Sequence, residues 1–111
     1  MGGDIIPTDA FIRVPKALMT NERYMKLSAE AKLLYALMDD RTRLSAANGW
    51  HDENGEVFIH FTIDEVCRAL HCRSEKACRA VSELEEVSLI YKRKRGRGRA
   101  TMIYVYAPQD F

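Results

Sequence analysis

The chain has 111 residues, of which 47% are hydrophobic and 30% charged, and this size and composition are typical of one soluble globular domain. It contains no run of about 18 apolar residues and no basic segment followed by an apolar stretch at its start. We therefore expect neither a membrane span nor a signal peptide, and predict a cytoplasmic protein. The net charge of +1 indicates no particular partner, but residues 89–111 hold six basic side chains and one acidic.

The first part of the chain is expected to form a short strand and a long helix. Residues 11–14 alternate apolar and polar side chains, which predicts a strand; Pro15 then ends it or opens a helical turn. Ser28 is expected to cap a helix from residue 29 to about residue 43. The predicted buried face of this helix consists of Ala31, Leu34, Tyr35 and Met38.

The middle of the chain predicts a loop and then a β-hairpin. Residues 44–49, which end in Asn48 and Gly49, are expected to form the loop. Residues 50–52 and 56–61 flank Asn54 and Gly55. An Asn-Gly pair between alternating segments indicates a hairpin turn, because both residues accept a positive φ.

Two helices joined by a tight turn are predicted next. Thr62 and Glu65 have the spacing of a capping box and start a helix of about two turns. Residues 71–73 form the connection, and Ser74 is expected to cap a longer helix that ends near Val87. The apolar faces of the two helices are Ile63, Val66, Cys67 and Leu70 in the first, and Ala77, Val81 and Leu84 in the second.

The chain is expected to end in a second hairpin. Residues 89–94 and 101–106 are rich in β-forming side chains and flank a turn with Gly96 and Gly98. Residues 1–111 are therefore predicted to form one α+β domain, a winged helix-turn-helix with a three-helix core and a β-hairpin wing. In this fold one helix packs on the core with one face and offers the other face to the major groove of double-stranded DNA.

The candidate DNA-binding residues fall into two groups. On the recognition helix they are Arg73, Ser74, Glu75, Lys76 and Arg79, and in the wing they are Lys92, Arg93, Lys94, Arg95, Arg97 and Arg99. Arg79 has the geometry to donate two hydrogen bonds to a guanine, and Glu75 either accepts one from a cytosine or holds Arg79 in place. The alternative interpretation of the helix residues is a solvated surface.

Six basic residues within eight positions repel one another, and binding to a polyanion relieves that repulsion. The alternative interpretation of the wing is a charged edge strand that prevents sheet-to-sheet pairing, which explains one or two lysines better than six cations.

The sequence predicts neither catalysis nor a bound cofactor or metal. Cys67, Cys72 and Cys78 lack a Cys-x2-Cys pair, so we expect small buried cysteines instead of a zinc site. Gly96 and Gly98 do not belong to a dinucleotide fingerprint, because no helix follows them. We therefore predict a binding protein and not an enzyme.

Several stretches resemble the N-terminal domain of the replication initiator protein A family of plasmids and integrative elements. They include Phe11-Ile12-Arg13-Val14-Pro15-Lys16, Leu27-Ser28-Ala29-Glu30-Ala31-Lys32-Leu33-Leu34-Tyr35 and Asn48-Gly49-Trp50-His51-Asp52. The resemblance implies binding to repeats at a replication origin as a homodimer. It also implies a further C-terminal region, absent from this chain, that contacts host replication proteins. We therefore expect the chain to be the N-terminal fragment of a longer initiator.

Two other functions remain open at this stage. A winged-helix transcriptional regulator would make the same DNA contacts at a promoter operator, and only the segment around Trp50 favours the initiator. The second alternative is a winged helix that contacts another protein instead of DNA. Leu33 and Leu37 widen the apolar face of the first long helix, which fits either a helix buried on two sides or a dimer surface.

Overall fold

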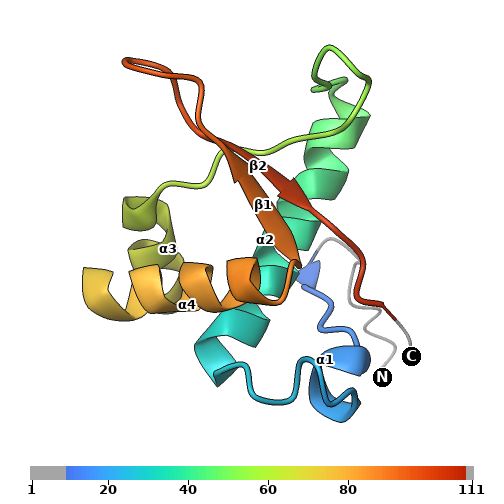
Figure 1. Ribbon diagram of the computed structural model, residues 1–111, viewed down its shortest axis with the longest axis vertical. Helices are drawn as coiled ribbons and strands as arrows, with labels where there is room; N and C mark the ends of the chain where they lie inside the picture. The colour runs from blue at the N-terminus through green and yellow to red at the C-terminus, as the bar shows by residue number, and fades with distance from the viewer. Residues whose placement is uncertain (1–9, 110–111) are drawn as a thin grey trace, which may run out of the picture.

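The computed structural model describes residues 10–109, which form helices packed beneath a small antiparallel sheet (Figure 1). The elements, in chain order, are α1 (Ala17–Thr20), α2 (Ala29–Ala47), α3 (Ile63–Leu70), α4 (Ser74–Glu86), β1 (Ile90–Arg93) and β2 (Met102–Val105). The predicted order of helix, short helix, turn, longer helix and hairpin is confirmed.

The sheet has two strands and one further bridge. Strands β1 and β2 pair antiparallel, with Ile90 opposite Val105 and Arg93 opposite Met102. On the other side of β2, Ile59 and Ile103 exchange two backbone hydrogen bonds of 2.9 and 2.8 Å. The segment after the first turn therefore contacts the sheet through this single bridge and forms no strand of its own.

The core lies where α2, α3 and α4 meet the sheet. The predicted face of α2 is confirmed, and it packs with the buried faces of the later helices and strands around Val66, Leu84, Ile59 and Leu89. Burying these side chains excludes water from apolar surface, which is the main source of stability for a domain of this size.

Side-chain caps fix the starts of α2 and α3. Ser28 accepts the backbone N–H of Ala31 at 3.1 Å, and it also donates its own N–H and hydroxyl to the Glu83 carboxylate at 2.7 and 3.0 Å. The predicted capping box of Thr62 and Glu65 is present with both of its hydrogen bonds. The tight connection before α4 is also confirmed, since His71 takes a left-handed conformation with φ 53°.

The structure corrects the expected strand and loop in the first half. Residues 11–14 are not a strand: their side chains are exposed, and Ile59 occupies the edge of β2 where an extra strand could pair. Residues 44–47 are not a loop, because α2 continues to Ala47. It ends when Trp50 donates its N–H to the Ser45 carbonyl at 2.9 Å, with Gly49 at φ 75°.

Two turn details also differ from expectation. The first hairpin holds only one bridge, His51 with Val57, and within its Asn-Gly pair only Gly55 has a positive φ. Ser74 does not cap α4; it is the first residue of the helix, and the cap position belongs to Arg73, whose side chain makes no capping hydrogen bond. The first turn of α4 therefore keeps backbone N–H groups without a side-chain acceptor.

Candidate nucleic-acid interface

The helix α4 buries one face and exposes the other. Ala77, Ala80, Val81 and Leu84 are buried in the core. The five residues predicted to contact DNA from this helix all lie on its exposed side: Arg73, Ser74, Glu75, Lys76 and Arg79. Four of them line one open hollow together with His71 and Cys72, namely Arg73, Glu75, Lys76 and Arg79.

The cations of this helix are largely free of internal partners. Lys76 lies 3.9 Å from Glu30, which is a long and exposed contact, and such surface pairs contribute little. Within the described residues neither Arg73 nor Arg79 forms an ion pair, so the alternative in which Glu75 holds Arg79 is not observed. Together with the uncapped first turn, these side chains give α4 a positive N-terminal end.

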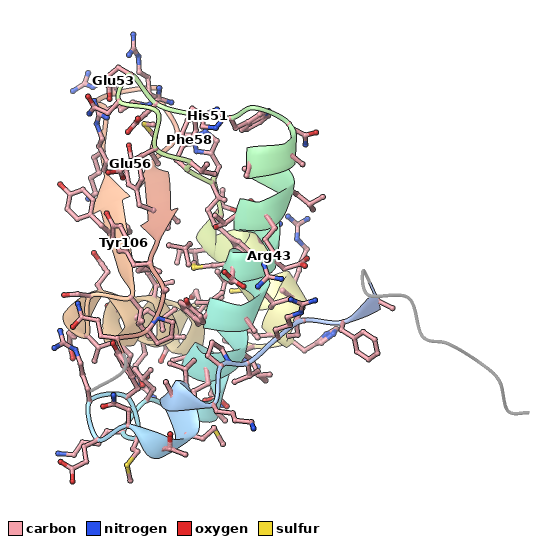
Figure 2. All side chains as sticks on the ribbon, turned by 90° about the vertical axis from the view of Figure 1, so that its right-hand side faces the viewer. Arg43, His51, Glu53, Glu56, Phe58 and Tyr106 are labelled. Atoms are coloured by element: carbon pink, nitrogen blue, oxygen red, sulfur yellow. The ribbon has the colours of Figure 1, made fainter. Side chains whose placement is uncertain are left out.

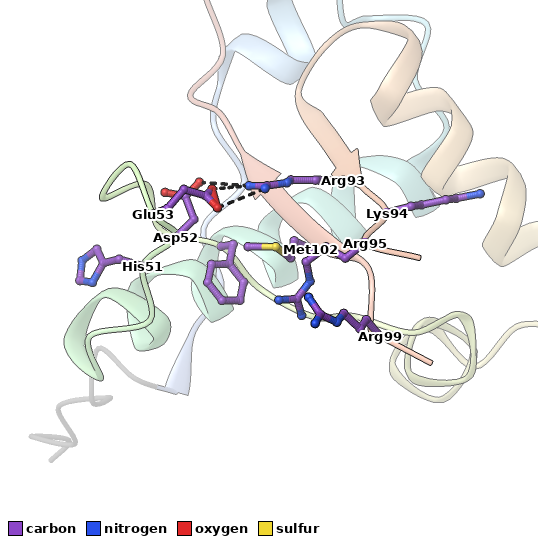
Figure 3. A pocket seen from close by; sticks show the side chains of 9 residues that line it. His51, Asp52, Glu53, Arg93, Lys94, Arg95, Arg99 and Met102 are labelled. Carbon is purple, nitrogen blue, oxygen red and sulfur yellow. Dashed lines mark hydrogen bonds and ion pairs between the residues drawn. The ribbon is translucent and has the colours of Figure 1, made fainter. Parts of the chain in front are cut away.

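The wing comprises β1, β2 and the connecting residues 94–101, and its six predicted cations divide into two groups. Lys92 pairs with Glu85 at 3.3 Å. Arg93 forms two hydrogen bonds with Glu53, the longer at 3.2 Å, and lies 3.9 Å from Asp52 (Figure 3). These two cations therefore attach the foot of the wing to the rest of the domain, which the sequence did not indicate.

A hydrogen-bond network around Asp52 completes this attachment. The Asp52 side chain is only 4% exposed and accepts from the Tyr104 hydroxyl at 2.7 Å and from the backbone N–H groups of Asn54 and Glu56 at 2.8 and 2.9 Å. The Tyr104 hydrogen bond is the main cause that lowers the pKa of Asp52, with the two N–H groups and Arg93 adding to it.

The hydrogen bond from Arg93 likewise lowers the pKa of Glu53. In turn, the hydrogen bond with the Glu53 carboxylate raises the pKa of Arg93. Asp52, Glu53 and Arg93 thus stay ionised near neutral pH and hold the turn at residues 52–56 against the wing.

The other four wing cations are exposed and form no ion pair with any residue in the described range 10–109. They are Lys94, Arg95, Arg97 and Arg99. The turn that carries them needs Gly96 and Gly98, whose φ values are 95° and 79°. In Figure 3 the side chains of Arg95 and Arg99 point toward each other, and Lys94 points the other way.

An open groove of about 500 Å³ separates the wing from the 51–58 segment. This wing groove is lined by His51, Asp52, Glu53, Phe58, Arg93, Lys94, Arg95, Arg99 and Met102. Its two carboxylates both lie against Arg93, and its four cations outnumber them, so the groove carries a net positive charge. Figure 2 places His51, Glu53 and Phe58 at this same end of the molecule.

The cysteines are less buried than expected. Cys67 and Cys72 are half-buried, and burial raises the pKa of the Cys67 thiol, but Cys78 lies exposed on the outer side of α4. The prediction of buried cysteines is therefore wrong for Cys78. Among residues 10–109 no cluster of three His, Cys, Asp or Glu side chains has the arrangement of a metal site, and none of the helices described is long and apolar enough to cross a membrane.

The helix pair α3–α4 with its tight turn, followed by the β1–β2 hairpin, defines a winged helix-turn-helix domain. Residues 10–109 match the family described as the replication initiator protein A (RepA) N-terminus, and the chain belongs to this family. The resemblance inferred from the sequence is thus confirmed.

Known proteins agree with this assignment. A "41 kDa protein" of Lactobacillus helveticus is 33% identical over 91 residues, which are 82% of this chain and 26% of that protein; the chain thus spans about a quarter of its relative's length.

Three solved structures each cover 97% of the chain. One is described as "N-Terminal domain of DNA binding protein"; its TM-score is 0.82, its sequence is 26% identical, and the match covers 86% of its own chain. A second is described as "Structure of Rep-DNA complex"; its TM-score is 0.81, its sequence is 26% identical, and the match covers 87% of its own chain. A third is described as "Structure of MDR initiator"; its TM-score is 0.77, its sequence is 28% identical, and the match covers 89% of its own chain. The winged-helix fold is therefore shared along nearly the whole chain.

Proposed function

We propose that this chain recognises double-stranded DNA sequence-specifically, as the origin-binding part of a replication initiator. One observation supports the proposal most: the uncapped N-terminal end of α4 and the turn between β1 and β2, which carries the free wing cations, lie toward the same side of the molecule (Figure 1). A similar protein of known structure is described as a Rep-DNA complex, which supports the same ligand for this chain.

Each group has a distinct part in the proposed complex. Arg79, Lys76 and Glu75 face base edges in the major groove, where an arginine can donate two hydrogen bonds to a guanine. Arg73, Ser74 and the free N–H groups of α4 meet phosphates. The four free wing cations contact the backbone beside the groove, whereas Lys92 and Arg93 position the wing and contribute little charge.

The proposed role is binding without a catalytic step, within a longer initiator. Host replication proteins would then contact a region outside this chain. We also propose that the chain acts as a homodimer, as its resemblance to the initiator family implies. Of the two leucines that widen the apolar face of α2, Leu37 packs against the core and Leu33 is 44% exposed, so Leu33 is the residue to test. Concentration-dependent sedimentation of the wild type and of Leu33→Ser tests the dimer separately from DNA binding.

Selection from random duplexes followed by sequencing tests the function. We expect enrichment of a repeated motif, and the distance between its two copies should reflect the geometry of a bound dimer. Arg79→Ala should relax preference at one base pair at a cost of about 1–3 kcal/mol, while Lys26→Gln, a cation outside both candidate groups, should leave the motif and affinity unchanged. Binding without enrichment, or no binding at low salt, would contradict the proposal.

A further inference from the structure

Three aromatic rings cluster outside the hydrophobic core, beside the wing. The ring centroids of Phe58 and His60 lie 5.4 Å apart, and each lies 6.3 Å from Trp50. Trp50 is 50% exposed, and the other two are half-buried. None of these rings belongs to the core between α2, α3, α4 and the sheet, so core packing does not account for them.

The aromatic cluster (Trp50, Phe58 and His60) joins two surface hollows. Phe58 lines the wing groove with Arg95 and Arg99. Trp50 and His60 line a second hollow of about 330 Å³, whose Arg41 is paired with Glu65 at 2.7 Å. Phe58 therefore brings the aromatic cluster to the groove that holds the free guanidinium groups of Arg95 and Arg99.

Hydrogen bonds hold the base of the wing groove together before any ligand binds. Arg93 bonds to Glu53 across the groove, and Tyr104 bonds to Asp52. Beyond them, the His60 ring nitrogen Nδ1 lies 2.8 Å from the carbonyl oxygen of Thr101. Because these contacts join the 51–60 segment to the wing, this base needs little ordering when a ligand binds, which favours affinity.

We propose that the wing groove, together with the adjacent Trp50 ring of the second hollow, binds single-stranded DNA. The phosphates lie on Arg95 and Arg99, and unstacked bases lie on the rings of Phe58 and Trp50. A positively charged groove next to exposed aromatic rings is the arrangement that binds single strands with little sequence preference. In a duplex the bases are stacked on one another and cannot reach the rings, so this activity is separate from major-groove recognition by α4. Within the proposed origin function, the ligand is a strand exposed when the duplex opens.

The one tryptophan of the chain gives a direct probe, because it belongs to the proposed site. Oligo(dT) added at low salt should quench Trp50 fluorescence in a saturable way. An abasic oligonucleotide of the same length supplies the phosphates without bases and should bind more weakly. Loss of one stacked base should reduce affinity by about 5- to 150-fold, so Phe58→Leu should weaken oligo(dT) binding by a factor in that range and leave abasic binding unchanged.

Variants separate this site from duplex recognition. Phe58→Leu should leave duplex binding unchanged, whereas Arg79→Ala should weaken duplex binding only. Arg99→Gln should weaken both, because its guanidinium meets a phosphate in either ligand, and Lys26→Gln should affect neither. Trp50→Leu, read out by fluorescence anisotropy of a labelled oligonucleotide, repeats the stacking test if Phe58→Leu fails to fold. No quenching at low salt, or equal binding of oligo(dT) and the abasic chain, overturns the inference. If duplex binding persists in the same protein, the proposed function stands.

Discussion

The division of the wing cations into free and paired groups predicts how salt affects duplex binding. Arg97 is exposed without an ion pair in the described part of the chain, whereas Lys92 already lies 3.3 Å from Glu85. A free cation that meets a phosphate releases a condensed counterion, but a cation that keeps its carboxylate partner releases almost none. We therefore expect Arg97→Gln and Lys92→Gln to behave differently, although both remove one positive charge from the same hairpin.

The magnitude follows from the number of free cations. Five exposed basic residues that are proposed to meet phosphates have no ion pair among residues 10–109: Arg73, Lys94, Arg95, Arg97 and Arg99. At about 0.9 per neutralised phosphate, the logarithm of the binding constant should fall with the logarithm of salt concentration with a slope of about −4.5. Arg97→Gln should make that slope shallower by about 0.9 and weaken binding about eightfold at 0.1 M salt. Lys92→Gln should change the slope by much less.

Fluorescence anisotropy of a labelled duplex, titrated at four or more salt concentrations, measures these slopes. Thermal melting of each variant checks that both are folded. If Lys92→Gln makes the slope as shallow as Arg97→Gln does, the ion pair with Glu85 does not persist in the complex, and the separation of the wing into a fixed foot and a free tip is refuted.

The remaining predictions concern stability. Leu84→Ala removes a fully buried side chain and should lower the free energy of unfolding by about 2–5 kcal/mol in urea denaturation; a loss below about 1 kcal/mol would contradict its place in the core. Tyr35→Phe removes the hydroxyl that donates a 2.7 Å hydrogen bond to the Tyr106 carbonyl, and should lower the free energy of unfolding by about 1–3 kcal/mol in the same assay. An unchanged denaturation midpoint would show that this contact is dispensable. Asp52→Asn should lower the melting temperature at neutral pH. The folded-state pKa of Asp52 is lowered, chiefly by Tyr104, so its ionised form stabilises the fold above the unfolded-state value of about 4 and that contribution disappears as pH falls through the folded-state pKa. The melting temperatures of the wild type and of Asp52→Asn should therefore converge as the pH is lowered from neutral. A difference in melting temperature that stays constant with pH would argue against the ionised carboxylate as the cause.

Local sequence signals predicted the parts of the fold that depend on neighbouring residues. The capping box at Thr62 needs only Glu65 three positions later, and the buried face of α2 follows from helical periodicity. The same reasoning failed for residues 44–47, where Leu44, Ala46 and Ala47 favour a helix and only the following Asn48 and Gly49 favour its end. Here the backbone bond from Trp50 to Ser45 decides where the helix ends.

Contacts between distant segments were not predictable in this way. The bridge between Ile59 and Ile103 joins residues 44 positions apart, and no local pattern indicates which segment will occupy the edge of β2. Residues 11–14 have the alternation of a strand but no place in the sheet. The pairing of Arg93 with Glu53 spans 40 positions, so the six wing cations looked equivalent in sequence.

That pairing also changes what the net charge means. A chain with a net charge of +1 has, on average, no reason to attract a polyanion. Yet acidic residues near the wing are engaged at its foot, where Asp52 and Glu53 face Arg93 and Glu85 faces Lys92. Arg93 and Lys92 thus neutralise two of these three negative charges, which reduces the repulsion between the domain and DNA at the tip. The four free cations beyond them therefore produce a local positive potential that the net charge of the whole chain does not reveal. The Lys92–Glu85 pair also attaches the foot of the wing to α4.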